Sequence, residues 1–163
     1  MSDTKPVALL DTDVASYMFK CSRMAWEYLA LLRGYQLGIS FITAAELWFG
    51  AEKQDWGARN RFRMERFLQE GLILPFGEGM DRVYAKVMAA RERMGRRMEK
   101  ADGWIAATAI YHDVPLAVHD SDFLGTPGLR IITASAEVRA AQLRMPAVIP
   151  RPLDLNASCR CSV

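Results

Sequence analysis

The sequence predicts an α/β fold, with a mostly parallel sheet of four or five strands and helices on both faces. Short runs of β-branched and aliphatic residues alternate along the chain with longer segments of helical periodicity. Strands that alternate with helices of this length are typical of parallel sheets covered on both sides. In addition, four carboxylates stand where an apolar run meets polar sequence. An acid at the carboxyl end of a buried strand lies at the edge where open α/β sheets bind their ligands.

The elements follow from the hydrophobic pattern and from the residues at their ends. Apolar runs predict strands at about residues 7–11, 37–42, 72–75, 115–118 and 129–132. Helical spacing predicts helices at 22–33, 43–54, 57–70, 79–98 and 101–112, with a shorter one at 135–143. Thr43 and Glu46 have the spacing of a helix capping box, and Gly34 and Gly71 suit helix ends. The segment 79–98 carries an apolar stripe at helical spacing, formed by Met80, Val83, Tyr84, Val87, Met88 and Met94.

The length and composition predict one compact domain. The chain has 163 residues, of which 51% are hydrophobic and 25% are charged, so it can bury a core without disulfides or a structural metal. We expect this domain to cover residues 1–143. The remaining residues, 144–163, contain three prolines and a polar end, which predicts a surface extension or a disordered tail.

The sequence also argues against several classes of protein. The N-terminus has no basic start followed by a long apolar segment, so we expect no signal peptide. No apolar run is long enough to cross a bilayer, and we expect no membrane association. Cys21, Cys159 and Cys161 form neither a zinc spacing nor a disulfide framework, which favours the reducing cytoplasm. The net charge of +2 indicates no particular partner.

The four carboxylates predict a metal site. They are Asp11 at the end of VALLD, Glu46 after GISFITAA, Asp102 at the start of DGWIAATAI and Asp120 at the end of PLAVHD. Acids gathered at one sheet edge repel one another and resist ionising together unless a cation lies between them. Carboxylate oxygens are ligands that suit Mg²⁺ or Mn²⁺.

Each acid also has a purely structural alternative. Asp11 and Asp13 follow an apolar run, where either side chain can cap the next helix, and Asp13 is the better placed of the two. Glu46 can be the partner of Thr43 in the capping box. Asp102, in the first turn of its helix, suits the positive end of the helix dipole.

Asp120 and Asp122 form a D-x-D pair, for which the structural alternative is an ordinary polar turn. In a short extended exit from the strand, the two side chains point to opposite sides, so only one of them faces the other acids. Asp120 is nearer the strand end, and we expect it to be the ligand. We expect Asp122 to cap the turn into Phe123 or to hold a metal-bound water.

Taken together, the four acidic segments resemble the PIN-domain ribonucleases, and most closely the VapC-type toxins of bacterial toxin–antitoxin pairs. The matching stretches within residues 7–133 are LLDTDVAS, ISFITAAELWFGA, KADGWIAATAI and LAVHDSDFLG, followed by GLRIIT. The resemblance implies a PIN-like three-layer sandwich. It places catalytic and metal-binding acids at Asp11, Glu46, Asp102 and Asp120, with Asp122 as a further metal ligand. Two features depart from the family pattern. His119 stands where a threonine–arginine or threonine–asparagine pair is common, and the chain beyond 134 is longer than usual.

The resemblance also implies the function and the partners. It predicts an Mg²⁺- or Mn²⁺-dependent endoribonuclease that hydrolyses phosphodiester bonds in RNA, such as tRNA or another structured RNA. It further predicts a cognate antitoxin that blocks the acidic pocket, and a homodimer. An antitoxin groove lined by Trp48, Phe49 and Trp56 is one expectation, with burial in the core as the alternative for each of them.

Two clusters of basic residues are candidate contacts for a phosphate backbone. The first is Arg59, Arg61, Arg63 and Arg66, and the second is Arg91, Arg93, Arg96, Arg97 and Lys100. The alternative is a solvated helix face balanced by Glu65, Glu92 and Glu99.

Two other functions compete with the ribonuclease. DTDVA is similar to the D-x-D start of haloacid-dehalogenase-like phosphatases, in which the first aspartate attacks phosphorus. That alternative leaves Glu46 and Asp102 without a role, and Ala15 stands where threonine or valine is expected. A catalytically inactive binding module is the third possibility, and the presence of all the acids argues against it.

Overall fold

The computed structural model describes residues 5–145, and residues 1–4 and 146–163 lie outside the described part. Nearly all of the predicted extension at 144–163, including Cys159 and Cys161, is therefore outside it, and the domain boundary at 143 stays a prediction. Among the helices of residues 5–145, none is both long enough and apolar enough to cross a bilayer.

Five strands form one sheet, and every neighbouring pair is parallel, as predicted. The strands are β1 (Val7–Leu10), β2 (Gln36–Ser40), β3 (Leu72–Leu74), β4 (Leu116–Ala117) and β5 (Ile131–Ile132). Their order is β3-β2-β1-β4-β5. The chain adds β2 and β3 on one side of the central β1, and then β4 and β5 on its other side. The direction in which strands are added therefore reverses at β1. A crevice is expected at such a point, outside the carboxyl ends of β1 and β4.

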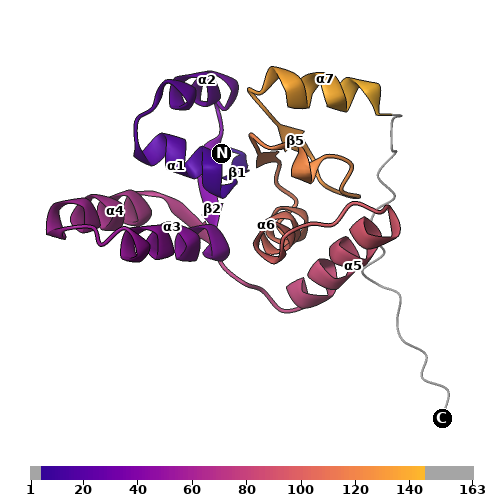
Figure 1. Cartoon of the computed structure of the whole chain (residues 1–163), viewed down its shortest axis with the longest axis horizontal. Coiled ribbons are helices and arrows are strands. Elements are labelled where there is room, and N and C mark those ends of the chain that lie inside the picture. Colours follow the sequence, from indigo (N-terminus) through magenta and orange to yellow (C-terminus); the bar gives the residue numbers. More distant parts are fainter. Residues whose placement is uncertain (1–4, 146–163) are drawn as a thin grey trace, which may run out of the picture.

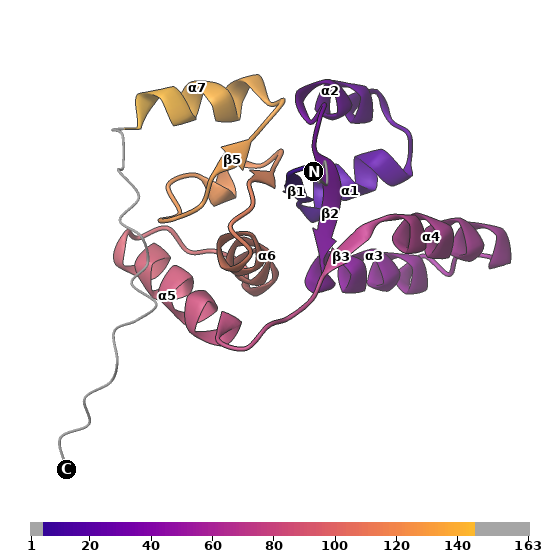
Figure 2. The ribbon, with the colours of Figure 1, turned by 180° about the vertical axis from the view of Figure 1, so that it is seen from behind.

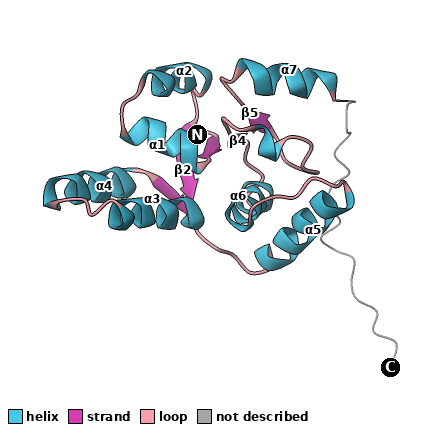
Figure 3. Ribbon diagram, viewed as in Figure 1, coloured by secondary structure: helices cyan, strands magenta, loops and turns pink. Residues whose placement is uncertain are grey.

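The helices that cover this sheet in the described part of the chain are seen in Figures 1 and 3. They are α1 (Thr12–Phe19), α2 (Arg23–Leu31), α3 (Phe41–Lys53), α4 (Ala58–Glu70), α5 (Met80–Arg93), α6 (Lys100–Tyr111) and α7 (Ala136–Arg144). A short 3₁₀ turn, η1 (Ser121–Phe123), lies between β4 and β5.

Alternate residues of β1 point to opposite faces of the sheet and so contribute to two parts of the core. Leu9 belongs to a cluster with Val87 of α5 and Ile105 of α6. Ala8 and Leu10 belong to the other cluster, which includes residues of α1, α2, α3 and α4. The two groups of helices are also separate in the reverse view (Figure 2). The predicted three-layer arrangement is confirmed.

Helix α6, which carries Asp102, packs closely on α5. A Cβ atom added to Gly103 would lie 2.5 Å from Sδ of Met88 and 2.9 Å from the ring of Tyr84. The rings of Tyr84 and Trp104 stack with their centroids 4.1 Å apart. The lack of a side chain at Gly103 therefore lets the first turn of α6 lie close against α5.

The start of α3 differs from the prediction. The helix begins at Phe41, and the Ser40 hydroxyl caps it by accepting a hydrogen bond from the Thr43 amide at 3.0 Å. The predicted capping box of Thr43 and Glu46 is therefore wrong. Strand β2 ends at Ser40, two residues earlier than predicted, so the hydroxyl that reaches the free amides is the one at position 40. Glu46 is left available for another contact.

Candidate functional site

An open cavity of about 330 Å³ lies where the crevice was expected, at the carboxyl edge of β1 and β4. Its lining comes from the ends of β1 and β4 and from α1, α3 and α6, and consists of Asp11, Thr12, Asp13, Glu46, Phe49, Asp102, Asp120 and Phe123. Four of the five predicted metal ligands thus meet at one place, although they are spread over more than a hundred residues of sequence. We call this hollow the acidic cavity.

Asp11 is buried, with only 4% of its surface exposed, and it is the N-cap of α1. Its Oδ1 accepts a hydrogen bond from the Val14 amide at 2.8 Å, so the assignment of this cap to Asp13 was wrong. Helix α1 starts directly after β1, which puts the capping position at residue 11. Capping leaves further lone pairs on the carboxylate for a second partner.

Burial also changes the ionisation of Asp11. It raises the pKa of this carboxyl from 3.8 to about 7, and the negative charges of Asp13 and Asp102 act in the same direction. Hydrogen bonds from the backbone amides of Val14 and His119 partly oppose the rise. The carboxylate is therefore costly to ionise in the absence of a cation.

Asp102 lies in the first turn of α6, where the helix dipole alone would lower its pKa. The pKa is instead raised to about 6, first by burial and then by the negative charges of Glu46, Asp122 and Asp120. Burial thus outweighs the dipole at this position. The repulsion between the acids that we expected from the sequence is the second cause of the rise.

Glu46 accepts a short hydrogen bond at Oε2 from the Thr12 hydroxyl. This bond joins α3 to the first residue of α1 and holds the Glu46 carboxylate beside the acidic cavity. Thr12 is a site residue that our sequence reasoning missed. The available signal was its position directly after Asp11, in the LLDT stretch that carried the family resemblance.

Asp120 and Asp122 have the reverse of the predicted capping roles. Oδ1 of Asp120 caps η1 by accepting from the Asp122 amide at 3.2 Å. The expectation that Asp122 caps this turn is therefore wrong, because the chain remains extended through Asp120 and turns immediately after it. Asp120 lines the acidic cavity as predicted. Asp122 does not line it, although its charge raises the pKa of Asp102.

The family model of the PIN domain matches residues 8–129. This chain belongs to the PIN-domain family.

Relatives of this PIN domain include named toxins and ribonucleases. VapC ribonuclease Y4jK of Sinorhizobium fredii is 35% identical over 134 aligned residues, which cover 76% of this chain and 94% of that protein. Toxin FitB of Neisseria gonorrhoeae is 33% identical over 123 aligned residues, which cover 69% of this chain and 87% of FitB.

Similar solved structures include toxin–antitoxin complexes. VapBC2 of Rickettsia felis, solved with a DNA fragment from its promoter, matches with a TM-score of 0.70 and 25% identity, covering 78% of this chain and 98% of that one. FitAB bound to a DNA fragment matches with a TM-score of 0.64 and 27% identity, covering 77% and 94%. The predicted PIN-like fold is confirmed by these matches.

The departure at His119 has a structural explanation in this PIN domain. The His119 ring lies edge-on to Tyr17, with centroids 5.3 Å apart, and its Nδ1 is 3.1 Å from the Tyr28 hydroxyl. The imidazole is thus packed among tyrosines and is not part of the lining of the acidic cavity. The backbone amide of His119 still contributes to the site, because its hydrogen bond to Asp11 lowers the pKa of that carboxyl.

One of the predicted phosphate-binding arginines, Arg91, is buried instead. Its Nη1 donates to the carbonyl of Leu124 and its Nη2 to the carbonyl of Asp122, both at 2.7 Å. The guanidinium therefore ties the end of α5 to the turn that follows Asp120. Arg91 therefore neither binds phosphate nor lies on a solvated helix face, and both alternatives from the sequence are wrong for this residue.

The donor set of the acidic cavity fits a hydrated cation better than a bare one. Within residues 5–145, no three Asp, Glu, His or Cys side chains are arranged to hold one metal ion directly. Mg²⁺, however, usually keeps several of its waters and binds through one or two carboxylates. An open cavity lined by carboxylates of raised pKa meets that requirement, because a hydrated cation offsets their repulsion without touching all of them.

The predicted aromatic groove residues divide into two kinds. Trp48 and Trp56 are half-buried against the core, as the structural alternative proposed. Phe49 is 67% exposed and lines the acidic cavity.

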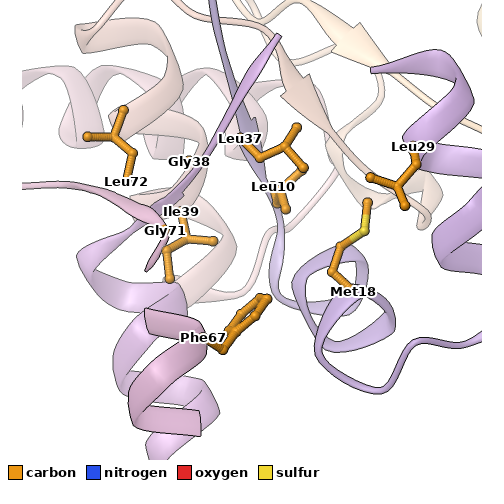
Figure 4. Close-up of a pocket in the computed structure, with 9 residues that line it drawn as sticks. All are labelled: Leu10, Met18, Leu29, Leu37, Gly38, Ile39, Phe67, Gly71 and Leu72. Carbon is orange, nitrogen blue, oxygen red and sulfur yellow. The ribbon is translucent and has the colours of Figure 1, made fainter. Parts of the chain in front are cut away.

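A second hollow, of about 280 Å³, is almost entirely apolar. Its lining side chains come from β1, α1, α2, β2, α4 and the start of β3 (Figure 4), and are Leu10, Met18, Leu29, Leu37, Gly38, Ile39, Phe67, Gly71 and Leu72. None of these residues is titratable, so this apolar cavity offers no acid–base or metal chemistry.

Proposed function

We propose that this PIN domain is an Mg²⁺- or Mn²⁺-dependent endoribonuclease and acts as the toxin of a toxin–antitoxin pair. One observation carries the proposal: carboxylates from β1, α3, α6 and the end of β4 line a single cavity. Two of them have pKa values raised to about 7 and 6 by burial and mutual repulsion. Membership of the PIN family and similarity to VapC ribonuclease Y4jK add support from sequence.

In this proposal, Asp11, Glu46, Asp102 and Asp120 hold the cation, directly or through water. When bound, a divalent cation lowers the pKa of the attacking water and neutralises charge on the phosphate. Thr12 keeps the Glu46 carboxylate beside the cavity. Asp120 is held by its capping bond to η1.

Asp102 is the candidate general base. A carboxylate with a pKa near the working pH is a suitable acceptor for the proton of the attacking water. In the metal-free protein the pKa of Asp102 is about 6, and its side chain is only partly buried, so that water can reach it. Asp11 is less accessible, because it is almost fully buried and one of its oxygens is bonded to the Val14 amide.

The cognate antitoxin is the second part of the proposal. VapBC2 of Rickettsia felis and FitAB, whose toxin chains resemble this one, are toxin–antitoxin complexes. The apolar cavity of Figure 4 is a suitable place for apolar side chains of such a partner, since Leu29 at its edge is 42% exposed. A homodimer and a cytoplasmic location remain predictions from the family resemblance.

An assay that removes and restores the metal tests the proposed activity. We expect cleavage of single-stranded RNA with Mn²⁺, loss of cleavage in EDTA and recovery when excess Mn²⁺ is added. A phosphomonoester should give no phosphate, since Glu46 and Asp102 line the cavity and have no role in an aspartyl-phosphate mechanism. Phosphate release from the monoester would favour the phosphatase, and the absence of both activities would favour the inactive binding module.

A further inference from the structure

A smaller hollow of about 150 Å³, lined by both polar and apolar residues, continues the acidic cavity along the groove between α1 and α3. The two share Thr12, Asp13 and Glu46 in their linings. Away from the acids, the smaller hollow is lined by Ser16, Phe19, Lys20, Leu47, Gly50, Gln54, Trp56 and Met64. A chain that occupies the acidic cavity therefore has an exit on this side, lined by polar and apolar side chains.

Aromatic and cationic side chains form the far end of that exit. The rings of Phe19 and Trp56 are stacked, with centroids 5.4 Å apart. The guanidinium of Arg63 lies 5.2 Å from the centroid of Phe19. Arg63 also lines an open hollow at the start of α4, with Gly57, Ala58, Arg59 and Asn60. The three hollows thus follow one another from the acids to α4, and α1, α3 and α4 lie at the same end of the molecule (Figure 1).

Some arginines of α4 form a salt bridge with a carboxylate, and others do not. Arg61 is ion-paired with Glu52, and Arg66 with Glu70, so the alternative of a solvated, balanced helix face is correct for these two. Within residues 5–145, no carboxylate forms a salt bridge with Arg59 or Arg63. Both uncompensated cations line the hollow at the end of the exit.

We infer that this groove is a binding track for single-stranded RNA, in which Lys20, Arg59 and Arg63 bind the phosphates that flank the cleaved bond. The inference rests on the proposed function and adds to it the path of the substrate along the protein. Cations that alternate with aromatic and hydrogen-bonding side chains are typical of surfaces that bind single strands. A peptide with acidic residues is the competing occupant, but the continuity of this groove with the acidic cavity favours the substrate of the proposed nuclease.

The salt dependence of RNA binding tests the track. A labelled RNA oligonucleotide is titrated with protein in Ca²⁺, chosen to allow binding without turnover, at several salt concentrations. The variant R59Q/R63Q should bind about tenfold more weakly, and the slope of log K against log salt should fall by about 1.4 for two lost contacts to a single strand. The matched control, R66Q/R82Q, removes the same charge from an ion-paired position on α4 and from exposed Arg82 on α5. Its slope should equal that of the wild type.

Three results would overturn the inference, and each has a different meaning. If the two double variants have equal Kd and slope while the wild type cleaves RNA with Mn²⁺, the track is wrong and the proposed function stands. If R59Q/R63Q loses affinity for the antitoxin but not for RNA, the groove belongs to the protein partner. If the wild type cleaves no RNA with any divalent cation, the track and the proposed function both fail.

Discussion

At the scale of single residues, Asp11 combines two properties that oppose each other. Asp11 caps α1 by accepting a hydrogen bond from a backbone amide, which favours its ionised form. Its carboxyl group is also buried, which favours the protonated form and raises its pKa to about 7. A carboxyl whose pKa is higher in the folded state than in the unfolded chain binds its proton more tightly when folded. It therefore contributes stability that is fully present below about pH 3.8 and is lost as the pH rises to about 7.

The first prediction concerns this pH dependence in the absence of metal. Between pH 4 and pH 7.5, the free energy of unfolding of the wild type should fall relative to that of Asp11→Asn, by about 4 kcal/mol if the full shift applies. Asparagine is a suitable comparison because it also caps helices well. Urea unfolding in EDTA at several pH values measures the difference. A difference that stays constant across this range would mean that the Asp11 pKa is not raised.

The second prediction separates Asp120 from Asp122. Because Asp120 lines the acidic cavity and Asp122 does not, Asp120→Asn should reduce RNA cleavage by about tenfold or more, a size typical of losses around metal sites. Asp122→Asn should cost much less. Asparagine at 120 can still accept the hydrogen bond that caps η1, so both variants should fold equally well. The reverse order of activity would identify Asp122 as the ligand.

At the scale of the elements, the site depends on bonds between segments that are distant in sequence. Thr12 joins α1 to Glu46 of α3, and Arg91 joins α5 to the carbonyls of Asp122 and Leu124. Neither bond could be predicted from the sequence. Residue spacing shows that an arginine lies near the end of a helix, but its burial depends on carbonyl groups more than thirty residues away.

The third prediction follows from the burial of Arg91. Substitution to methionine should lower the free energy of unfolding by about 3 kcal/mol, because two hydrogen bonds from a charged donor are lost and two carbonyls lose their partner. Arg93→Met, an exposed position on the same helix, should change it by less than about 0.5 kcal/mol. Thermal or urea unfolding of the two variants checks this. Equal stability of the two would mean that Arg91 does not anchor the turn.

Most of the elements were predictable, but helix α1 (Thr12–Phe19), which none of the predicted helical ranges covers, and several helix caps were not. The five strands lie close to where the apolar runs predicted them. The signal is strongest for β1 and β4, because a strand that is buried on both faces needs a continuous apolar segment. The hydrophobic pattern did not show whether Ser40 or Thr43 caps α3, since either hydroxyl can accept a hydrogen bond from an amide in the first turn of a helix. Similarly, Asp11 and Asp13 both suit the start of α1, and only the absence of a loop after β1 decides between them.

At the scale of the whole molecule, the sheet order explains why acids that are remote in sequence meet. Asp11 follows β1 and Asp120 follows β4, the two strands between which the order reverses. The sequence predicted four of the five acids that line the cavity, because each of the four stands where an apolar run meets polar sequence. The track along α1, α3 and α4 was not predictable, since it depends on which arginines of one helix find a partner.

The fourth prediction concerns metal binding by the folded protein. A cation that binds only the folded state raises the thermal midpoint, and protonated carboxyls compete with it. Mn²⁺ should therefore raise the midpoint more at pH 7.5 than at pH 5, where Asp11 and Asp102 are protonated in the folded protein. Calorimetry with and without Mn²⁺ at both pH values measures this. An equal rise at both would place the bound metal away from these acids.

The most direct test of the account is the initial rate of RNA cleavage as a function of Mn²⁺ concentration, for the wild type and for Asp102→Asn at equal folded fraction. We expect the wild-type rate to rise to a plateau with Mn²⁺ and the products to lack a cyclic phosphate, because water is the attacking group. Asp102→Asn should be slower, or need more Mn²⁺, by about tenfold or more. Cleavage by Asp102→Asn with the rate and Mn²⁺ dependence of the wild type would contradict a shared acidic metal site.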